Sequence, residues 1–241
     1  FKFTKNYNFC IWLKQFLNIL VLYRLYPFHF ENKLKMNFLS IGANRWSDCN
    51  LVATEFNDGR TLPVVESIEE WKALSAQGKP CCCAYDFDSK NIKKYGLIYN
   101  PHAIEFALEI LPDGTRIASR ADWNNLIESL GGNSPVNNYT PTESLLAIKS
   151  EKGWRKQLVQ GTSVNMNGNN SSGFSALPGG DLFIGSSFRG KGFGTMWWTS
   201  DWHRPHITQY DKHVICFSEG DSIPSDDRGH CSGAYIRIIK T

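Results

Sequence analysis

The chain has 241 residues, a formal net charge of +3, 41% hydrophobic residues and seven cysteines. This length allows one large domain or two small ones, and it is sufficient for a sizeable core without disulfide support. The composition excludes a disordered, a collagen-like and a membrane-spanning chain.

The basic charge lies in residues 1–35, which carry six basic side chains and one acidic side chain. Three interpretations of this segment stay open. Lys14 precedes an apolar stretch at 16–23, as in a secretion signal, but no small-residue cleavage site follows. The apolar run ends at Arg24 and is too short for a membrane anchor. We therefore expect no segment that spans a membrane, and N-terminal membrane targeting stays open. The third is a gene-model extension that is not native to the folded domain.

We therefore divide the chain into an N-terminal extension, residues 1–35, and a domain, residues 36–241. The domain part carries 20 basic and 22 acidic side chains. A nucleic-acid interface needs clustered Lys and Arg, so we expect no nucleic-acid partner.

Two helices are predicted in the first half of the domain. At residues 67–74, Ser67 is the expected N-cap and Glu70 completes a capping box. At residues 119–131, Ser119 caps the helix together with Asp122, and apolar residues recur at helical spacing from Trp123. Residues 97–100 and 103–108 are apolar but ambiguous in type.

The last hundred residues contain short strand-like runs at 174–177, 181–184, 195–199, 213–217 and 234–239. The last run alternates, with Tyr235, Arg237 and Ile239 on one face. Helices followed by short strands predict an α+β fold.

Several segments, in order, resemble the Fibrobacter succinogenes major paralogous domain family, which is common in Bacteroidota and Fibrobacterota. The most specific is NSSGFSALPGG at residues 170–180, and WWTS follows at 197–200. The helix at 117–132, the YGLIYN stretch at 95–100 and residues 45–63 resemble upstream family segments. The resemblance covers residues 40–241, with departures at Pro101-His102 and in the closing strand.

The resemblance implies a C-type-lectin-like fold, similar to that of formylglycine-generating enzymes, with two helices packed on small twisted antiparallel sheets and long loops. It also implies an extracytoplasmic protein, secreted or lipid-anchored on the outer surface. No enzymatic activity comes with the family.

Three adjacent cysteines, Cys81, Cys82 and Cys83, are the most unusual local feature. Adjacent strand residues point to opposite faces, so the three thiols cannot share one metal ion. Buried thiols, a disulfide from one of them to Cys49, Cys216 or Cys231, and a reactive role all remain open. The oxygen-rich segment 86–91 is interpreted as a solvated turn.

The candidate ligand contacts lie near the tryptophan pair. Trp197 and Trp198 should point to opposite strand faces, with one in the core and one nearer the surface. Downstream, polar and aromatic side chains cluster within fourteen positions. The predicted ligand-binding residues are Trp198, Trp202, His203, Arg204, His206 and Asp211.

We therefore expect a non-enzymatic surface or secreted binding module that presents loops around residues 185–232 to a glycan or a surface protein. We expect no cofactor, no metal and no catalytic residue. One alternative is a metal- or thiol-dependent enzyme that uses His203 and His206 or the three cysteines. The other is a structural surface component.

Overall fold

The computed structural model describes residues 36–132, 143–202, 212–218, 225–228 and 231–241, and of residues 212–218 and 225–228 only the backbone. The predictions for residues 1–35 lie outside this part of the chain. Residues Met36–Thr241 form one compact unit. Its described helices and 3-10 turns are short: α2 (Ile68–Ala76), η1 (Tyr85–Phe87), η2 (Ser89–Asn91), α3 (Ile92–Tyr95), α4 (Pro101–Glu105), α5 (Ala107–Ile110), α6 (Arg120–Ser129) and α7 (Glu143–Ile148).

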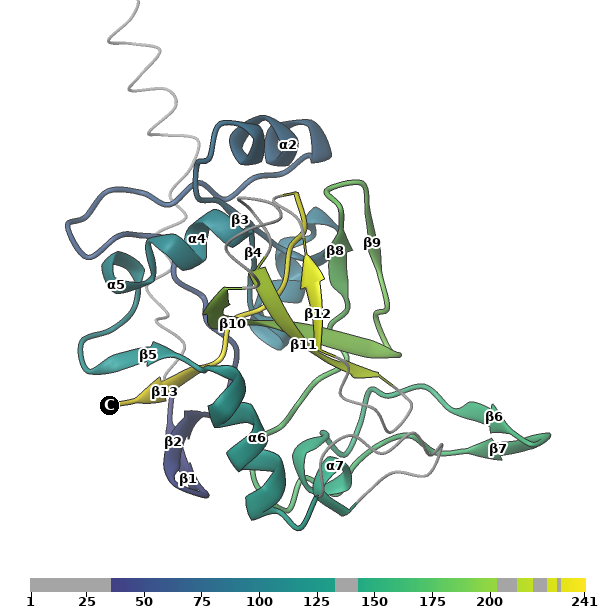
Figure 1. Ribbon diagram of the computed structural model, residues 1–241. Coiled ribbons are helices and arrows are strands. Elements are labelled where there is room, and N and C mark those ends of the chain that lie inside the picture. Colours follow the sequence, from purple (N-terminus) through teal and green to yellow (C-terminus); the bar gives the residue numbers. More distant parts are fainter. Residues whose placement is uncertain (1–35, 133–142, 203–211, 219–224, 229–230) are drawn as a thin grey trace, which may run out of the picture. The chain divides into compact units, whose positions relative to one another are not determined.

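The strands are short as well, and every pair within a sheet is antiparallel (Figure 1). They are β1 (Phe38–Ile41), β2 (Asn44–Ser47), β3 (Cys82–Cys83), β4 (Ile98–Tyr99), β5 (Thr115–Ile117), β6 (Gln157–Val159), β7 (Thr162–Val164), β8 (Asp181–Phe183), β9 (Ser187–Arg189), β10 (Gly194–Trp202), β11 (Lys212–Ser218), β12 (Ser225–Arg228) and β13 (Ile238–Lys240).

One four-stranded sheet joins the two ends of the domain, in the order β1-β2-β13-β5. In this sheet Trp46 of β2 lies opposite Leu39 of β1 on one side and Ile239 of β13 on the other. A second sheet has the order β10-β11-β12, and the pairs β3-β4, β6-β7 and β8-β9 form three two-stranded sheets. Short helices beside small antiparallel sheets make the fold α+β, as predicted.

Both predicted helices form, and their N-termini differ in detail. The Ser119 hydroxyl accepts the Asp122 N–H, and the Asp122 carboxylate accepts the Ser119 N–H, which completes the capping box of α6. In α2 the Ser67 hydroxyl accepts the Glu70 N–H, but the Glu70 carboxylate accepts the Glu66 N–H instead of the one at Ser67. The capping box predicted for α2 is therefore wrong, although its N-cap is correct.

The apolar residues 97–100 and 103–108, whose type was ambiguous from the sequence, belong to a strand and two helices. Ile98–Tyr99 pairs with the cysteine strand β3 as β4. Asn100 then caps α4, because its side-chain oxygen accepts the Ala103 N–H at 3.1 Å and Pro101 occupies the first helical turn. The same oxygen accepts the N–H of Cys81 at 3.1 Å, so Asn100 connects the start of α4 to the residue that precedes β3.

The core consists of two clusters, and several extended segments lie between them. Tyr235 and Ile239 pack in the first cluster, whereas Ala234, Ile236 and Ile238 pack in the second. The predicted alternation of residues 234–239 is thus present, but both faces are buried. A segment buried on both sides forms a wall inside the domain and offers no surface for a ligand.

The run at 174–177 was predicted as a strand and forms none. Ser175 has a positive φ of 59°, which is incompatible with strand geometry. Asn170 stabilises this bend, because its side chain accepts the Ser175 N–H at 2.7 Å and donates to the Ser175 hydroxyl at 3.1 Å. Only Ala176 makes an isolated bridge, to Lys149.

Candidate functional site

Trp198, the first of the predicted ligand contacts, is a core residue. Its side chain has 0% exposure, and its indole N–H donates to the Tyr99 carbonyl at 2.8 Å. Trp197 is equally buried and donates to the Asn50 side-chain oxygen at 2.8 Å. The two rings do point to opposite faces, since they belong to different core clusters. The expectation that one of them lies nearer the surface is wrong, because both faces of β10 are covered here.

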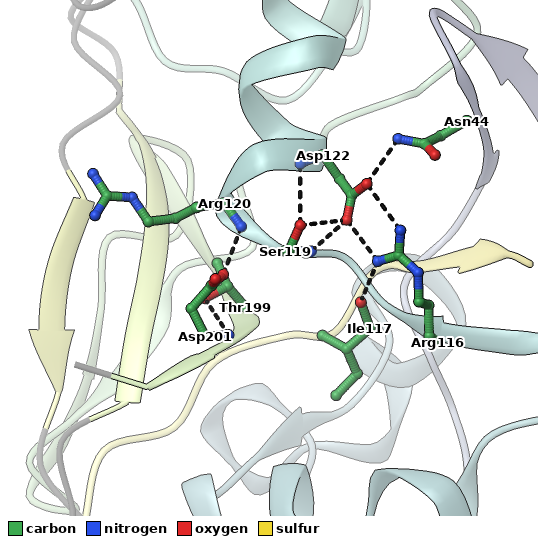
Figure 2. Close-up of polar contacts among 8 residues, drawn as sticks. All are labelled: Asn44, Arg116, Ile117, Ser119, Arg120, Asp122, Thr199 and Asp201. Atoms are coloured by element: carbon green, nitrogen blue, oxygen red, sulfur yellow. Dashed lines mark hydrogen bonds and ion pairs between the residues drawn. The ribbon is translucent and has the colours of Figure 1, made fainter. Parts of the chain in front are cut away.

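The other predicted ligand contacts cannot be placed in the site. The Trp202 side chain and residues His203, Arg204, His206 and Asp211 lie outside the described residues. Their neighbour Asp201 is described: its carboxylate accepts the Arg120 N–H at 2.6 Å, at the first turn of α6 (Figure 2). Asp201 therefore stabilises a helix N-terminus.

The three adjacent cysteines are buried with 0% exposure. Cys81 and Cys83 pack in one core cluster and Cys82 in the other, as strand alternation requires. Burial raises the pKa of the Cys81 thiol to about 12, and it raises the pKa values of Cys82 and Cys83 well above the ordinary value. Thiols of this kind are poor nucleophiles. The described cysteine side chains are free, so the disulfides considered from 81–83 to Cys49 or Cys231 are absent, and the Cys216 side chain is not described.

Two further properties concern metals and membranes. Within the described ranges, no group of three His, Cys, Asp or Glu side chains comes together in a way that could hold a metal ion. In the same part of the chain, no helix combines the length and the apolar character that crossing a membrane requires.

A pocket of about 510 Å³ lies where η1 and α3 face the loop between β9 and β10. Its lining combines aromatic and charged side chains with two loop glycines, and we call it the Lys191 pocket. The side chains that line it are Tyr85, Asp86, Tyr95, Arg155, Lys191 and Phe193. A volume of this size lies within the range of small-molecule sites, and the lining is more polar than most of them have.

The wall of the Lys191 pocket is built by the glycine-rich loop 190–194. The Gly192 N–H donates to the Pro178 carbonyl at 2.9 Å, and the Gly180 N–H donates to the Gly194 carbonyl at 2.8 Å. A Cβ at Gly180 would overlap the Arg189 carbonyl oxygen and lie 2.6 Å from the Tyr85 ring. Gly180 also has a φ of +75°, so this position requires glycine.

The cations of the pocket are held against aromatic rings. The Lys191 ammonium lies 5.0 Å from the Tyr85 ring centre and donates a hydrogen bond to the Asn91 amide oxygen at 3.2 Å. The Arg155 guanidinium lies 4.6 Å from the centre of the Phe193 ring. These are cation–π distances, and such contacts contribute about 0.5–1 kcal/mol at exposed sites. Burial raises the pKa of the Tyr85 hydroxyl, so it stays neutral.

Residues 39–240 match the sequence model of the Fibrobacter succinogenes major domain. The chain belongs to the Fibrobacter succinogenes major domain family. No curated protein and no solved structure matches it significantly.

The segments that resemble the Fibrobacter succinogenes major domain have clear structural roles. Phe174 packs edge-on against Trp46, Trp123 and Trp197, with ring centres 5.6 to 6.1 Å apart. The Gly179 carbonyl accepts the Tyr235 hydroxyl at 2.9 Å, and Pro178 and Gly180 hold the pocket loop. One end of the family motif therefore packs in the core, and the other end holds the loop that forms a wall of the Lys191 pocket.

The side chains that line the Lys191 pocket were not predicted as a site from the sequence. Loop 190–194 lies within the region 185–232 that was expected to present a ligand site, but Tyr85, Tyr95 and Arg155 come from distant parts of the chain. One available signal is the alternation Gly190-Lys191-Gly192-Phe193-Gly194, which places a cation and an aromatic ring in a tight loop.

Proposed function

We propose that this domain is a non-enzymatic binding module and that the Lys191 pocket receives part of a glycan. The observation that carries the proposal is the pocket itself, where an aromatic ring that is 38% exposed, Phe193, lies beside two cations and the Asp86 carboxylate. Sugars offer an apolar ring face that stacks on aromatic side chains, and hydroxyl groups that bond to charged and polar groups.

The small size of the pocket favours a glycan over a protein partner. A volume of about 510 Å³ suits one or two sugar rings, whereas a stable protein interface needs a much larger contact surface. A surface-protein partner therefore becomes an outcome of the binding test.

The thiol-enzyme alternative is disfavoured by the burial of Cys81, Cys82 and Cys83 and by their raised pKa values. The alternative that uses His203 and His206 concerns residues outside the described ranges, and it stays an alternative. So does a purely structural surface role.

The C-type-lectin-like fold group and the extracytoplasmic location are also proposals. They are supported by the family resemblance and are compatible with the α+β arrangement of small antiparallel sheets. A secreted or lipid-anchored protein would meet glycans at the cell surface, which agrees with the proposed activity.

The proposal is tested by screening the full chain on a glycan array and measuring the best ligand by calorimetry. The variant Phe193→Ala removes the exposed ring and should weaken binding about 10-fold or more, because aromatic contacts dominate such sites. Leu108→Ala is the matched control, since Leu108 is 87% exposed on α5 and does not line the pocket. Absence of any glycan ligand, or equal binding by Phe193→Ala and the parent chain, would overturn the proposal.

A further inference from the structure

We propose that the Lys191 pocket selects glycans that carry an acidic group, a sugar carboxylate or a sulfate ester. This inference rests on the glycan-binding function proposed above and names the class of sugar. It follows from the charge, the placement and the partners of the side chains at the pocket.

Positive charge exceeds negative charge at this site. Arg155 and Lys191 line the pocket, and the Lys94 ammonium lies 4.8 Å from the centre of the Tyr95 ring that also lines it. Asp86 is the carboxylate among the lining residues. The nearby Asp181 adds little negative charge, because Arg189 pairs with it at 3.1 Å.

The three cations have no carboxylate partner within the described residues. The ion pairs found there involve other groups, such as Arg189 with Asp181 and Arg116 with Asp122. Lys191 donates to a neutral amide oxygen instead, that of Asn91. A bound anion would therefore gain charge-assisted hydrogen bonds without first breaking an ion pair.

Two of the cations also share one aromatic ring. The Lys191 ammonium lies 5.8 Å and the Lys94 ammonium 4.8 Å from the centre of the Tyr95 ring. The two ammonium groups therefore lie within roughly a Debye length of each other, so they repel. An anion bound beside Lys191 would relieve this repulsion, which a neutral sugar cannot do.

The remaining lining suits the neutral part of a sugar acid. Phe193 is 38% exposed, and the Asp86 carboxylate can accept hydrogen bonds from sugar hydroxyl groups. The Arg155 guanidinium is planar and can donate two parallel hydrogen bonds to a carboxylate or a sulfate. Because Arg155 lies against Phe193, the acidic group and the sugar ring would bind side by side.

The test is an array on which each glycan is present in a neutral, a uronate-bearing and a sulfated form, probed with the full chain. We expect the acidic form to bind at least about 10-fold more tightly than its neutral counterpart, because its charged group forms charge-assisted hydrogen bonds. The preference should shrink when NaCl rises from 50 to 500 mM. The uronate and sulfate arms show which acidic group the pocket takes.

Two variants then test whether the preference for acidic glycans comes from the Lys191 pocket. Lys191→Met keeps the aliphatic side chain on the tyrosine rings and removes the charge, and Arg155→Gln removes the guanidinium. Each should weaken binding of the acidic glycan about 10-fold and leave the neutral form within about 3-fold. Lys93→Met is the matched control, because Lys93 is an exposed lysine of α3 that does not line the pocket. Thermal melting of each variant verifies folding.

Three outcomes are distinguishable. If the chain binds glycans and Phe193→Ala weakens them, but neutral forms bind as well as acidic forms, the proposed function stands and this inference is overturned. If the acidic preference survives both Lys191→Met and Arg155→Gln, the pocket is not its source and the inference is also overturned. If no glycan binds at all, the proposed function and the inference fail together.

Discussion

At the scale of single residues, Asp122 links three parts of the chain through one carboxylate (Figure 2). The carboxylate accepts two hydrogen bonds from the Arg116 guanidinium, at 2.6 and 3.0 Å, and one from the Asn44 amide at 2.9 Å. It also accepts the Ser119 N–H and hydroxyl. Burial alone would raise the pKa of Asp122, but the hydrogen bonds from Arg116 and Ser119 outweigh burial and lower the pKa to about 2.

This pKa predicts how stability changes with pH. The folded-state pKa of Asp122 lies below the ordinary value of 3.8, so its contribution is present above pH 4 and is lost as the pH falls toward 2. The contribution is about 2 kcal/mol. Urea unfolding between pH 5 and pH 2 should show this loss in the parent chain and not in Asp122→Asn. The exposed Asp113→Asn should keep the parent slope, and an unchanged slope in Asp122→Asn would contradict the assignment.

Asn50 shows what a single sequence does not reveal about a residue. Its side-chain oxygen accepts the Trp197 indole N–H and the Arg237 Nε–H, both at 2.8 Å, and its amide donates to the Tyr95 carbonyl at 2.7 Å. Asn50 was noted only as part of a family segment. Its role could not be predicted, because its partners lie 45 to 187 positions away along the chain.

At the scale of elements, the alternation of side chains along strands was predictable, but the burial of both strand faces was not. Cys81 to Cys83, Trp197 and Trp198 all alternate between two faces, as the period of two requires. The sequence contains no local signal that both faces are covered, since coverage depends on helices and strands from elsewhere in the chain. For this reason Trp198 was placed among the ligand contacts.

The cysteine strand β3 yields a chemical prediction. Because the thiols of Cys81, Cys82 and Cys83 are buried and their pKa values are raised, they should resist a maleimide at pH 8 while the protein is folded. Mass spectrometry of the digested chain should find these three residues unmodified, and modified once guanidinium has unfolded the protein. Rapid labelling of Cys82 in the folded protein would instead support a thiol enzyme.

The loop beside β8 yields a structural prediction. Gly180→Ala should destabilise the domain by about 2 kcal/mol or more and weaken glycan binding, because the new Cβ meets the Arg189 carbonyl, the Tyr85 ring and the Lys191 nitrogen. Gly59→Ala is the control, since Gly59 has a φ of +86° and open space around its Cα. It should cost only about 1 kcal/mol of backbone strain. Equal costs in urea unfolding would refute the packing argument.

At the scale of the whole molecule, the family and the α+β class followed from the sequence, because the NSSGFSALPGG motif and the helix caps are local signals. The Lys191 pocket did not. It joins Tyr85 and Tyr95 to Arg155 and to loop 190–194. That loop donates a hydrogen bond to the Pro178 carbonyl and accepts one from the Gly180 N–H, which hold it in place. Such a pocket forms only when distant segments pack together, so it could not be predicted. The polar residues after Trp198 are close together in the sequence itself, and for this reason they were chosen as candidates.

The most direct test of the account is a crystal structure of the full chain with the glycan that binds best on the array. The account predicts sugar density in the Lys191 pocket, with a ring against Phe193 and an acidic group within hydrogen-bond distance of Lys191 and Arg155. Sugar density at another surface, with the Lys191 pocket empty at a saturating ligand concentration, would contradict it.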